Sequence, residues 1–125
     1  MKDFYICSHC GNVAGKIIDS GVDMICCGEK MEKLIPKSAD NTNEKHVPVI
    51  EVKDNDVKVT VGSTPHPMKD EHYIEFIILE TDQGCQIKML KPNDKPIATF
   101  KLNDCEKVVN AYEYCNVHGF WIAEL

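Results

Sequence analysis

The spacing of the cysteines in the N-terminal part constrains this chain more than any other feature. Seven of the 125 residues are cysteines, and four of them lie within the first 27 residues. Cys7 and Cys10 form a Cys-x2-Cys motif, and the adjacent pair Cys26 and Cys27 follows. A segment this short cannot stabilise itself by burial alone and needs a metal or disulfides. Four thiolates at this spacing predict a tetrahedral all-sulfur metal site, for which zinc and iron are the usual occupants. A vicinal disulfide between Cys26 and Cys27 is the alternative.

The same cysteines bear on the compartment in which the protein works. An odd number of cysteines cannot all pair within one chain, and clustered cysteines in a reducing compartment indicate metal binding. Residues 1–7 lack the apolar core of a signal peptide, and no apolar run approaches the ~20 residues that span a membrane. We therefore expect a cytoplasmic protein without membrane segments. The net charge of −6 argues against general nucleic-acid binding, which needs a basic face.

The hydrophobic pattern changes after residue 45 and predicts a second domain. Residues 37–45 are polar and turn-rich, as in a linker. Strand-like stretches with period-two alternation follow at 47–52, 57–61, 73–80, 86–90 and 97–102, and two more lie between 108 and 125. No convincing amphipathic helix is present. The prediction is an all-β chain with a small metal-bound domain (1–36), a linker (37–45) and a seven-stranded antiparallel sandwich of immunoglobulin-like type (46–125).

The predicted sandwich carries a second group of potential metal ligands. Its members are imidazoles and one thiol: His46, His66, His72, Cys115 and His118. Only the Cys-x2-His pair of Cys115 and His118 is a strong signal by itself. Prolines on both sides of His66 would stiffen its loop. If all five residues bind one metal, the ligand count favours iron over zinc, because catalytic zinc usually has three protein ligands.

Several motifs together give the chain a family resemblance. They are Cys7-x2-Cys10 with Cys26-Cys27, Glu44-Lys45-His46-Val47-Pro48, His66-Pro67-Met68-x3-His72-Tyr73-Ile74-Glu75, Leu90-Lys91-Pro92-x3-Pro96 and Glu113-Tyr114-Cys115-Asn116-x-His118-Gly119. On these motifs, which cover nearly the whole chain, the sequence resembles the desulfoferrodoxins, the two-iron class of superoxide reductases.

The resemblance implies two iron ions per chain. The small domain resembles desulforedoxin and would hold one iron on its four cysteines. The large domain is similar to neelaredoxin and would hold the catalytic iron on four equatorial histidines and an axial Cys115, with His118 binding through Nδ1. The implied reaction is the one-electron reduction of superoxide to hydrogen peroxide. The resemblance also implies a homodimer and suggests rubredoxin as the electron donor.

Two charged residues beside His46 are candidate catalytic groups. A cation at Lys45 would attract the superoxide anion and orient the water that delivers protons. Glu44 is a hard donor that would occupy the sixth position of ferric iron after peroxide leaves. Exposed linker charge is the simpler interpretation of both residues. Cys85 and Cys105 fall outside the ligand set and are interpreted as ordinary thiols.

Two other functions are compatible with parts of the sequence. In the first, the four-cysteine centre is an electron carrier of rubredoxin type, and the sandwich only promotes dimerisation. That interpretation leaves the five metal-type residues of the large domain without a role. In the second, the protein binds zinc at a structural four-cysteine site and a hydrolytic histidine site. The ligand count and the cysteine close to His118 argue against it.

Overall fold

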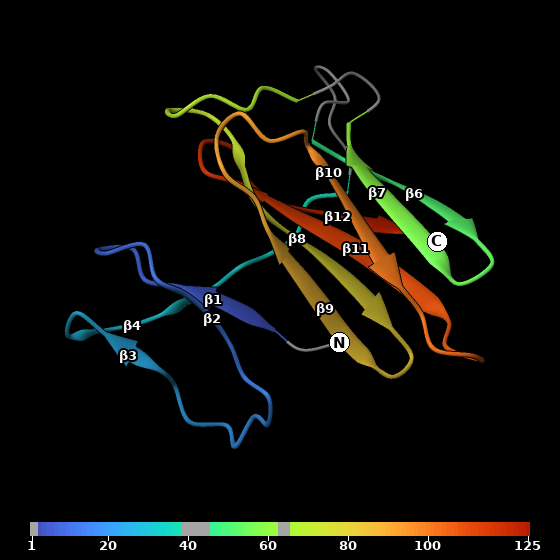
Figure 1. Ribbon diagram of the computed structural model, residues 1–125. Coiled ribbons are helices and arrows are strands. Elements are labelled where there is room, and N and C mark those ends of the chain that lie inside the picture. Colours follow the sequence, from blue (N-terminus) through green and yellow to red (C-terminus); the bar gives the residue numbers. More distant parts are fainter. Residues whose placement is uncertain (1–2, 39–45, 63–65) are drawn as a thin grey trace. The chain divides into compact units, whose positions relative to one another are not determined.

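The computed structural model describes residues 3–38, 46–62 and 66–125. The chain divides into two compact units, residues 1–35 and residues 36–125 (Figure 1). Strands and turns make up both units, and the described ranges contain no helix, which confirms the all-β prediction. It follows that nothing in these ranges is a helix long and apolar enough to cross a membrane.

The small unit contains five short strands in two sheets. Strand β1 pairs with β2 and β5 in a three-stranded antiparallel sheet, and β3 pairs with β4 in a hairpin. The strands are β1 (Phe4–Ile6), β2 (Val13–Gly15), β3 (Ile25–Cys26), β4 (Glu29–Lys30) and β5 (Glu32–Lys33). Of its large apolar side chains, Ile17, Ile18, Val22 and Ile25 remain exposed. Burial in this unit is therefore small, as its length predicts.

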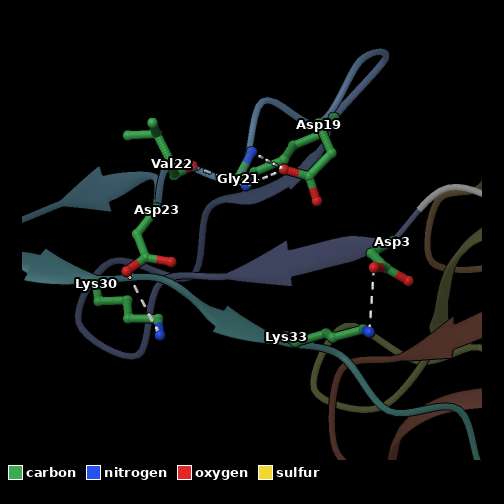
Figure 2. Close-up of polar contacts among 8 residues, drawn as sticks. Asp3, Asp19, Gly21, Val22, Asp23, Lys30 and Lys33 are labelled. Atoms are coloured by element: carbon green, nitrogen blue, oxygen red, sulfur yellow. Dashed lines mark hydrogen bonds and ion pairs between the residues drawn. The ribbon is translucent and has the colours of Figure 1, made fainter.

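Polar contacts close the loops of the small unit, as Figure 2 shows. The Asp19 carboxylate accepts a hydrogen bond from the backbone N–H of Gly21 at 2.8 Å and contacts the Lys16 ammonium at 3.0 Å. Two further ion pairs join Asp23 to Lys30 at 3.5 Å and Asp3 to Lys33 at 3.1 Å. The side chains of these last two pairs are largely exposed, so each of the two contributes little stability. The loops still need another source of rigidity.

Seven strands build the large unit. They are β6 (Pro48–Lys53), β7 (Asp56–Val61), β8 (Ile74–Thr81), β9 (Gly84–Met89), β10 (Ile97–Lys101), β11 (Val108–Cys115) and β12 (Gly119–Glu124). One antiparallel sheet has the order β10-β7-β6 and the other has the order β12-β11-β8-β9 (Figure 1). The seven-stranded antiparallel architecture predicted from the alternating pattern is therefore present.

The core of the large unit lies between these two sheets. Alternate residues of β7 (Val57, Val59 and Val61) face buried residues of the other sheet, among them Ile77 and Leu79 of β8. Alternation of this kind places one face of each strand inside and the other outside. Cys115, at the end of β11, belongs to the same buried cluster. The core thus extends to the end of the sandwich that carries the second set of candidate ligands.

Candidate metal centres

The hairpin β3–β4 allows two adjacent cysteines to face one point. Cys27 and Gly28 form its two-residue turn, and both have positive φ values, 52° and 76°. A two-residue hairpin turn of type I′ requires positive φ at both central positions. Glycine adopts this conformation without strain, whereas a cysteine there is uncommon. The turn directs the Cys27 thiol toward the others instead of away from them.

The structure brings the four cysteines of the small unit together. Their Sγ atoms lie within 4.8 Å of one another, and those of Cys10 and Cys26 are 3.6 Å apart. Cys7 is buried at the centre of the unit, whereas Cys10 and Cys27 are exposed. The described residues include all seven cysteines, and no disulfide joins any of them. The geometry therefore disagrees with the vicinal-disulfide alternative.

The electrostatics of this cluster suit a bound cation. The backbone N–H of Cys10 lowers the pKa of the Cys7 thiol to about 6. Hydrogen bonds with the neighbouring thiols, with Cys10 the largest contributor, raise the pKa of Cys27 to about 12. Like charges at this separation cannot all form without compensation. A divalent metal supplies that compensation, so the donor set fits zinc or iron.

His9, inside the first cysteine motif, is not one of the clustered residues. Its side chain is half exposed, and its Nε2 lies 3.1 Å from a carboxylate oxygen of Glu29. Asn12, just after the motif, approaches Cys26 with its side-chain amide, Nδ2 to Sγ, at 3.6 Å. Both contacts join the first motif to the β3–β4 hairpin from outside the sulfur cluster.

The large unit gathers the five residues of the second predicted group. Their potential ligand atoms also lie within 4.8 Å of one another: His46, His66, His72, Cys115 and His118. His46 precedes β6, His66 and His72 lie in the loop before β8, and the other two lie at the turn between β11 and β12. Ring centroids of neighbouring histidines are 4.6–5.0 Å apart. Three segments distant in sequence thus converge at one end of the sandwich.

Two imidazole nitrogens of this group are buried without a hydrogen-bond partner. They are Nε2 of His66 and Nε2 of His72, and nothing in the described part of the chain bonds to either atom. Nδ1 of His66 lies 2.7 Å from the carbonyl oxygen of Pro67, which assigns the proton to Nδ1 and leaves a lone pair on Nε2. Burial lowers the pKa of His66 to about 4, so the ring is neutral at physiological pH. A neutral imidazole with an unpartnered ring nitrogen is what a metal site requires.

The turn between β11 and β12 presents a sulfur and a nitrogen to the same point. His118 Nδ1 lies 3.9 Å from Cys115 Sγ and 3.0 Å from His46 Nε2. The backbone N–H of His118 approaches the Cys115 sulfur at 3.4 Å. Burial raises the pKa of the Cys115 thiol, so a cation is needed to favour the thiolate here. The five residues named from the sequence thus lie together, and His118 directs its Nδ1 toward the Cys115 sulfur and the His46 ring.

Asn116 connects the β11–β12 turn to the loop before β8, and both segments carry candidate ligands. Its side-chain oxygen accepts a hydrogen bond from the Tyr73 N–H at 3.0 Å, and its side-chain amide donates to the Glu71 carbonyl at 3.2 Å. Its own backbone N–H donates to the Tyr73 carbonyl at 3.2 Å. These bonds hold the residues directly before and directly after His72. The sequence analysis included Asn116 in a motif but assigned it no role.

A buried carboxyl group lies two residues before Cys115. Glu113 is fully buried on β11, paired with Ile77 and Trp121 in the neighbouring strands, and its carboxyl oxygens have no partner among the described residues. Burial raises the pKa of Glu113 to about 9, so the group is uncharged at neutral pH. The sequence analysis did not single it out, because alternation alone cannot distinguish a buried glutamate from an exposed one.

Of the other residues named from the sequence, some lie outside the described ranges and some lie outside both clusters. The two candidate catalytic residues, Glu44 and Lys45, lie outside the described residues. Cys85 and Cys105 are exposed and belong to neither cluster. Trp121, which stacks on His46 with ring centroids 4.8 Å apart, was not singled out from the sequence.

Comparison with known proteins agrees with these two centres. The family model described as Desulfoferrodoxin matches residues 38–124. The chain is 48% identical to the desulfoferrodoxin of Nitratidesulfovibrio vulgaris over 122 residues, which is 98% of this chain and 95% of that protein. It is 44% identical to the desulfoferrodoxin of Desulfarculus baarsii over 121 residues, 96% of this chain and 94% of that protein.

A solved structure extends the likeness to three dimensions. The superoxide reductase from Treponema pallidum matches with a TM-score of 0.86 and 34% identity, covering 99% of this chain and 98% of that chain. The family model leaves out the small unit, whereas the two relatives and this structural match cover it as well as the sandwich. The protein therefore belongs to the desulfoferrodoxin family.

Proposed function

We propose that this protein is a superoxide reductase that reduces superoxide to hydrogen peroxide at an iron in its large unit. In the balanced reaction, one superoxide anion, one electron and two protons give one hydrogen peroxide. The observation that carries the proposal is the convergence of four imidazoles and one thiol within 4.8 Å, in a member of a family that includes a superoxide reductase. Iron in that group would supply the single electron.

The residues proposed to hold this iron are His46, His66, His72, His118 and Cys115. Five protein donors exceed the three that catalytic zinc usually takes and leave room for one exogenous ligand on a six-coordinate metal. His66 is oriented for this role by the contact of its Nδ1 with the Pro67 carbonyl. Cys115 is oriented by the His118 N–H, which approaches its sulfur. Contacts within the chain therefore help to orient these two donors.

Glu44 and Lys45 are proposed as the groups that act on substrate and product. They directly precede His46 in the sequence, so they are tied covalently to one of the five donors. A lysine cation next to the site would attract superoxide and orient the water that delivers its protons. A glutamate carboxylate would take the vacant iron position once peroxide has left.

The small unit is proposed to hold a second iron on Cys7, Cys10, Cys26 and Cys27, which makes residues 1–36 a desulforedoxin-like domain, 37–45 a linker and 46–125 the catalytic domain. Metal there would also stabilise a unit that buries little apolar surface. We further propose that the protein works as a cytoplasmic homodimer and that rubredoxin returns the electron to the catalytic iron. The family resemblance supports the homodimer and the electron donor, and the clustered cysteines, typical of a reducing compartment, support the location.

The stoichiometry of product formation tests the function. Purified iron-loaded protein, kept reduced, is exposed to a measured pulse of superoxide, and hydrogen peroxide and oxygen are both quantified. A reductase forms one peroxide for each superoxide and releases no oxygen. A dismutase forms half as much peroxide and releases oxygen, and a simple electron carrier leaves superoxide to its spontaneous decay. Either of the last two results would reject the proposal.

Metal analysis and colour test the choice of metal. A ferric four-cysteine centre absorbs visible light, and oxidation of a thiolate-bound iron adds a band at longer wavelength. Two iron ions per chain and both spectral features are expected. A colourless protein that contains only zinc would favour the zinc-protein alternative.

A further inference from the structure

Lys37 is anchored on the strand that follows the second metal centre. Its backbone N–H donates to the Phe120 carbonyl at 2.9 Å, and its carbonyl accepts from the Ile122 N–H at 2.9 Å. The two bonds form a parallel bridge between Lys37 and Trp121 of β12. This residue, the first of the stretch that the sequence analysis treated as a linker, therefore has a fixed backbone position beside the site.

The side chain of Lys37 reaches the turn that carries two of the candidate ligands. Its Nζ donates to the carbonyl oxygen of His118 at 3.2 Å and lies 5.0 Å from the ring centroid of Trp121. The Trp121 Nε1–H donates to the same carbonyl, also at 3.2 Å. The ammonium also lies close to Gly119, because a Cβ atom added to that glycine would be 4.0 Å from Nζ. Lysine and tryptophan thus share one acceptor, the backbone oxygen of a ligand residue.

The tryptophan links this arrangement to a second ligand. The Trp121 ring stacks on His46 with an interplanar angle of 14° and a centroid distance of 4.8 Å. Both rings are buried, with 6% of Trp121 and 5% of His46 exposed. A cation within about 6 Å of an indole ring is attracted by the ring's electron density. Lys37 therefore contacts His118 directly and contacts His46 through Trp121.

We propose that Lys37 is a positioning residue of the histidine–cysteine centre, holding Trp121 against His46 and placing a positive charge on the His118 turn. This inference deepens the proposed function and rests on metal being bound there. Metal ligands depend on outer partners that orient them and tune their electronic properties. A fixed positive charge near a metal disfavours its more highly charged, oxidised form. The ammonium should therefore raise the reduction potential of the iron.

An exposed lysine that merely covers an aromatic ring would contribute little to stability and nothing specific to the metal. Three features favour a role of Lys37 in positioning the histidine–cysteine centre. The backbone of Lys37 is fixed on both sides, its ammonium has a direct hydrogen bond to a ligand residue, and the ring it contacts stacks on another ligand. Charge and geometry therefore act on the same two histidines.

The test compares Lys37→Met and Lys37→Gln, which remove the charge, with Lys37→Arg, which keeps it. Lys58→Met, on an exposed position of β7, is the matched control for net charge. Redox titration of the iron-loaded proteins, followed by the long-wavelength absorption, reports the potential of the second centre. We expect about a threefold shift toward the oxidised form in Lys37→Met and Lys37→Gln, which is about 30 mV for one electron. Lys37→Arg and Lys58→Met should match the wild type.

The second measurement uses Trp121 itself, the only tryptophan in the chain. Quenching of its emission by acrylamide should increase in Lys37→Met and Lys37→Gln and stay low in Lys37→Arg and Lys58→Met. Unchanged potential and quenching in both charge-removing variants would overturn the inference. Equal shifts in Lys58→Met would also overturn it, since net charge would then be the cause. Neither measurement uses superoxide, so a failed reductase assay would leave this result intact.

Discussion

Nε2 of His46 lies 3.0 Å from Nδ1 of His118, although 72 residues separate them in the sequence. Two bare lone pairs at this distance repel, so the pair needs a shared proton or a cation between them. The buried, unpartnered Nε2 atoms of His66 and His72 lie in the same cluster. One metal ion satisfies all of these nitrogens together, whereas one proton cannot.

Replacing the sulfur donor of the large unit should affect only one of the two centres. Cys115→Ser should abolish the long-wavelength band of the oxidised protein and reduce superoxide turnover by more than the roughly 10- to 100-fold typical of outer-shell changes. The absorption of the four-cysteine centre should stay unchanged, because those thiols lie in the other unit. Spectra and turnover are compared with Cys105→Ser, which alters an exposed thiol. Turnover in Cys115→Ser equal to that of this control would remove Cys115 from the ligand set.

Asn116 should be required for a stable second centre. Asn116→Ala removes the two side-chain hydrogen bonds to Tyr73 and Glu71, at a cost of about 1–3 kcal/mol in the free energy of unfolding. His72 would lose its anchoring, so a chelator should extract iron from this centre about tenfold faster. Chemical denaturation and timed chelation measure the two effects. Asn103→Ala, at an exposed turn position, is the control, and identical behaviour of the two variants would contradict the prediction.

Lys45 should govern the capture of superoxide. Lys45→Ala is expected to slow the second-order reaction with superoxide about tenfold, because a cation beside a binding site raises the encounter rate of an anion. The rate should also depend less on salt, which screens that attraction. Pulse radiolysis over a range of ionic strength measures both quantities. Lys58→Ala controls for net charge, and a Lys45→Ala variant with wild-type rate and salt slope would exclude this role.

Removal of metal should unfold the small unit and spare the sandwich. Residues 1–35 bury little apolar surface, and their four clustered thiols repel one another once ionised, whereas residues 36–125 have a continuous apolar core. Hydrogen exchange after treatment with a chelator should therefore show lost protection in β1 to β5 and retained protection in β7, β8 and β11. Protection retained throughout the small unit would show that its fold does not depend on metal.

Alkaline pH should destabilise the large unit through Tyr112. Burial, followed by the hydrogen bond from its hydroxyl to Glu80 at 3.0 Å, raises the pKa of Tyr112, and the nearby Cys85 adds to the shift. A raised pKa favours the neutral phenol in the folded state, so this stabilisation is complete below the unfolded pKa of about 10 and decreases as the pH rises above it. Tyr112→Phe should show a smaller decrease in the free energy of unfolding between about pH 9 and 11. Parallel curves for the two proteins would refute the prediction.

The alternating pattern and the residue types were sufficient to predict the all-β architecture. Period-two alternation in β6 to β12 arises because each strand buries one face and exposes the other. This pattern involves only residues that are close in the chain. The cysteine motifs predicted a thiolate cluster for the same reason, since Cys7 with Cys10 and Cys26 with Cys27 are close in sequence. Of the second group, only Cys115 and His118 could be paired from spacing.

Only the tertiary structure could decide which side chains support the second group. The five donors meet because three segments lie at the same end of the sandwich. These segments are the residue before β6, the loop before β8 and the β11–β12 turn. Trp121, Asn116 and Lys37 support these donors through contacts between strands and loops that no local sequence pattern encodes. The sequence by itself determined the donor types and the strand pattern. Long-range packing decided how the donors are oriented, buried and charged, because those properties arise from neighbours distant in the chain.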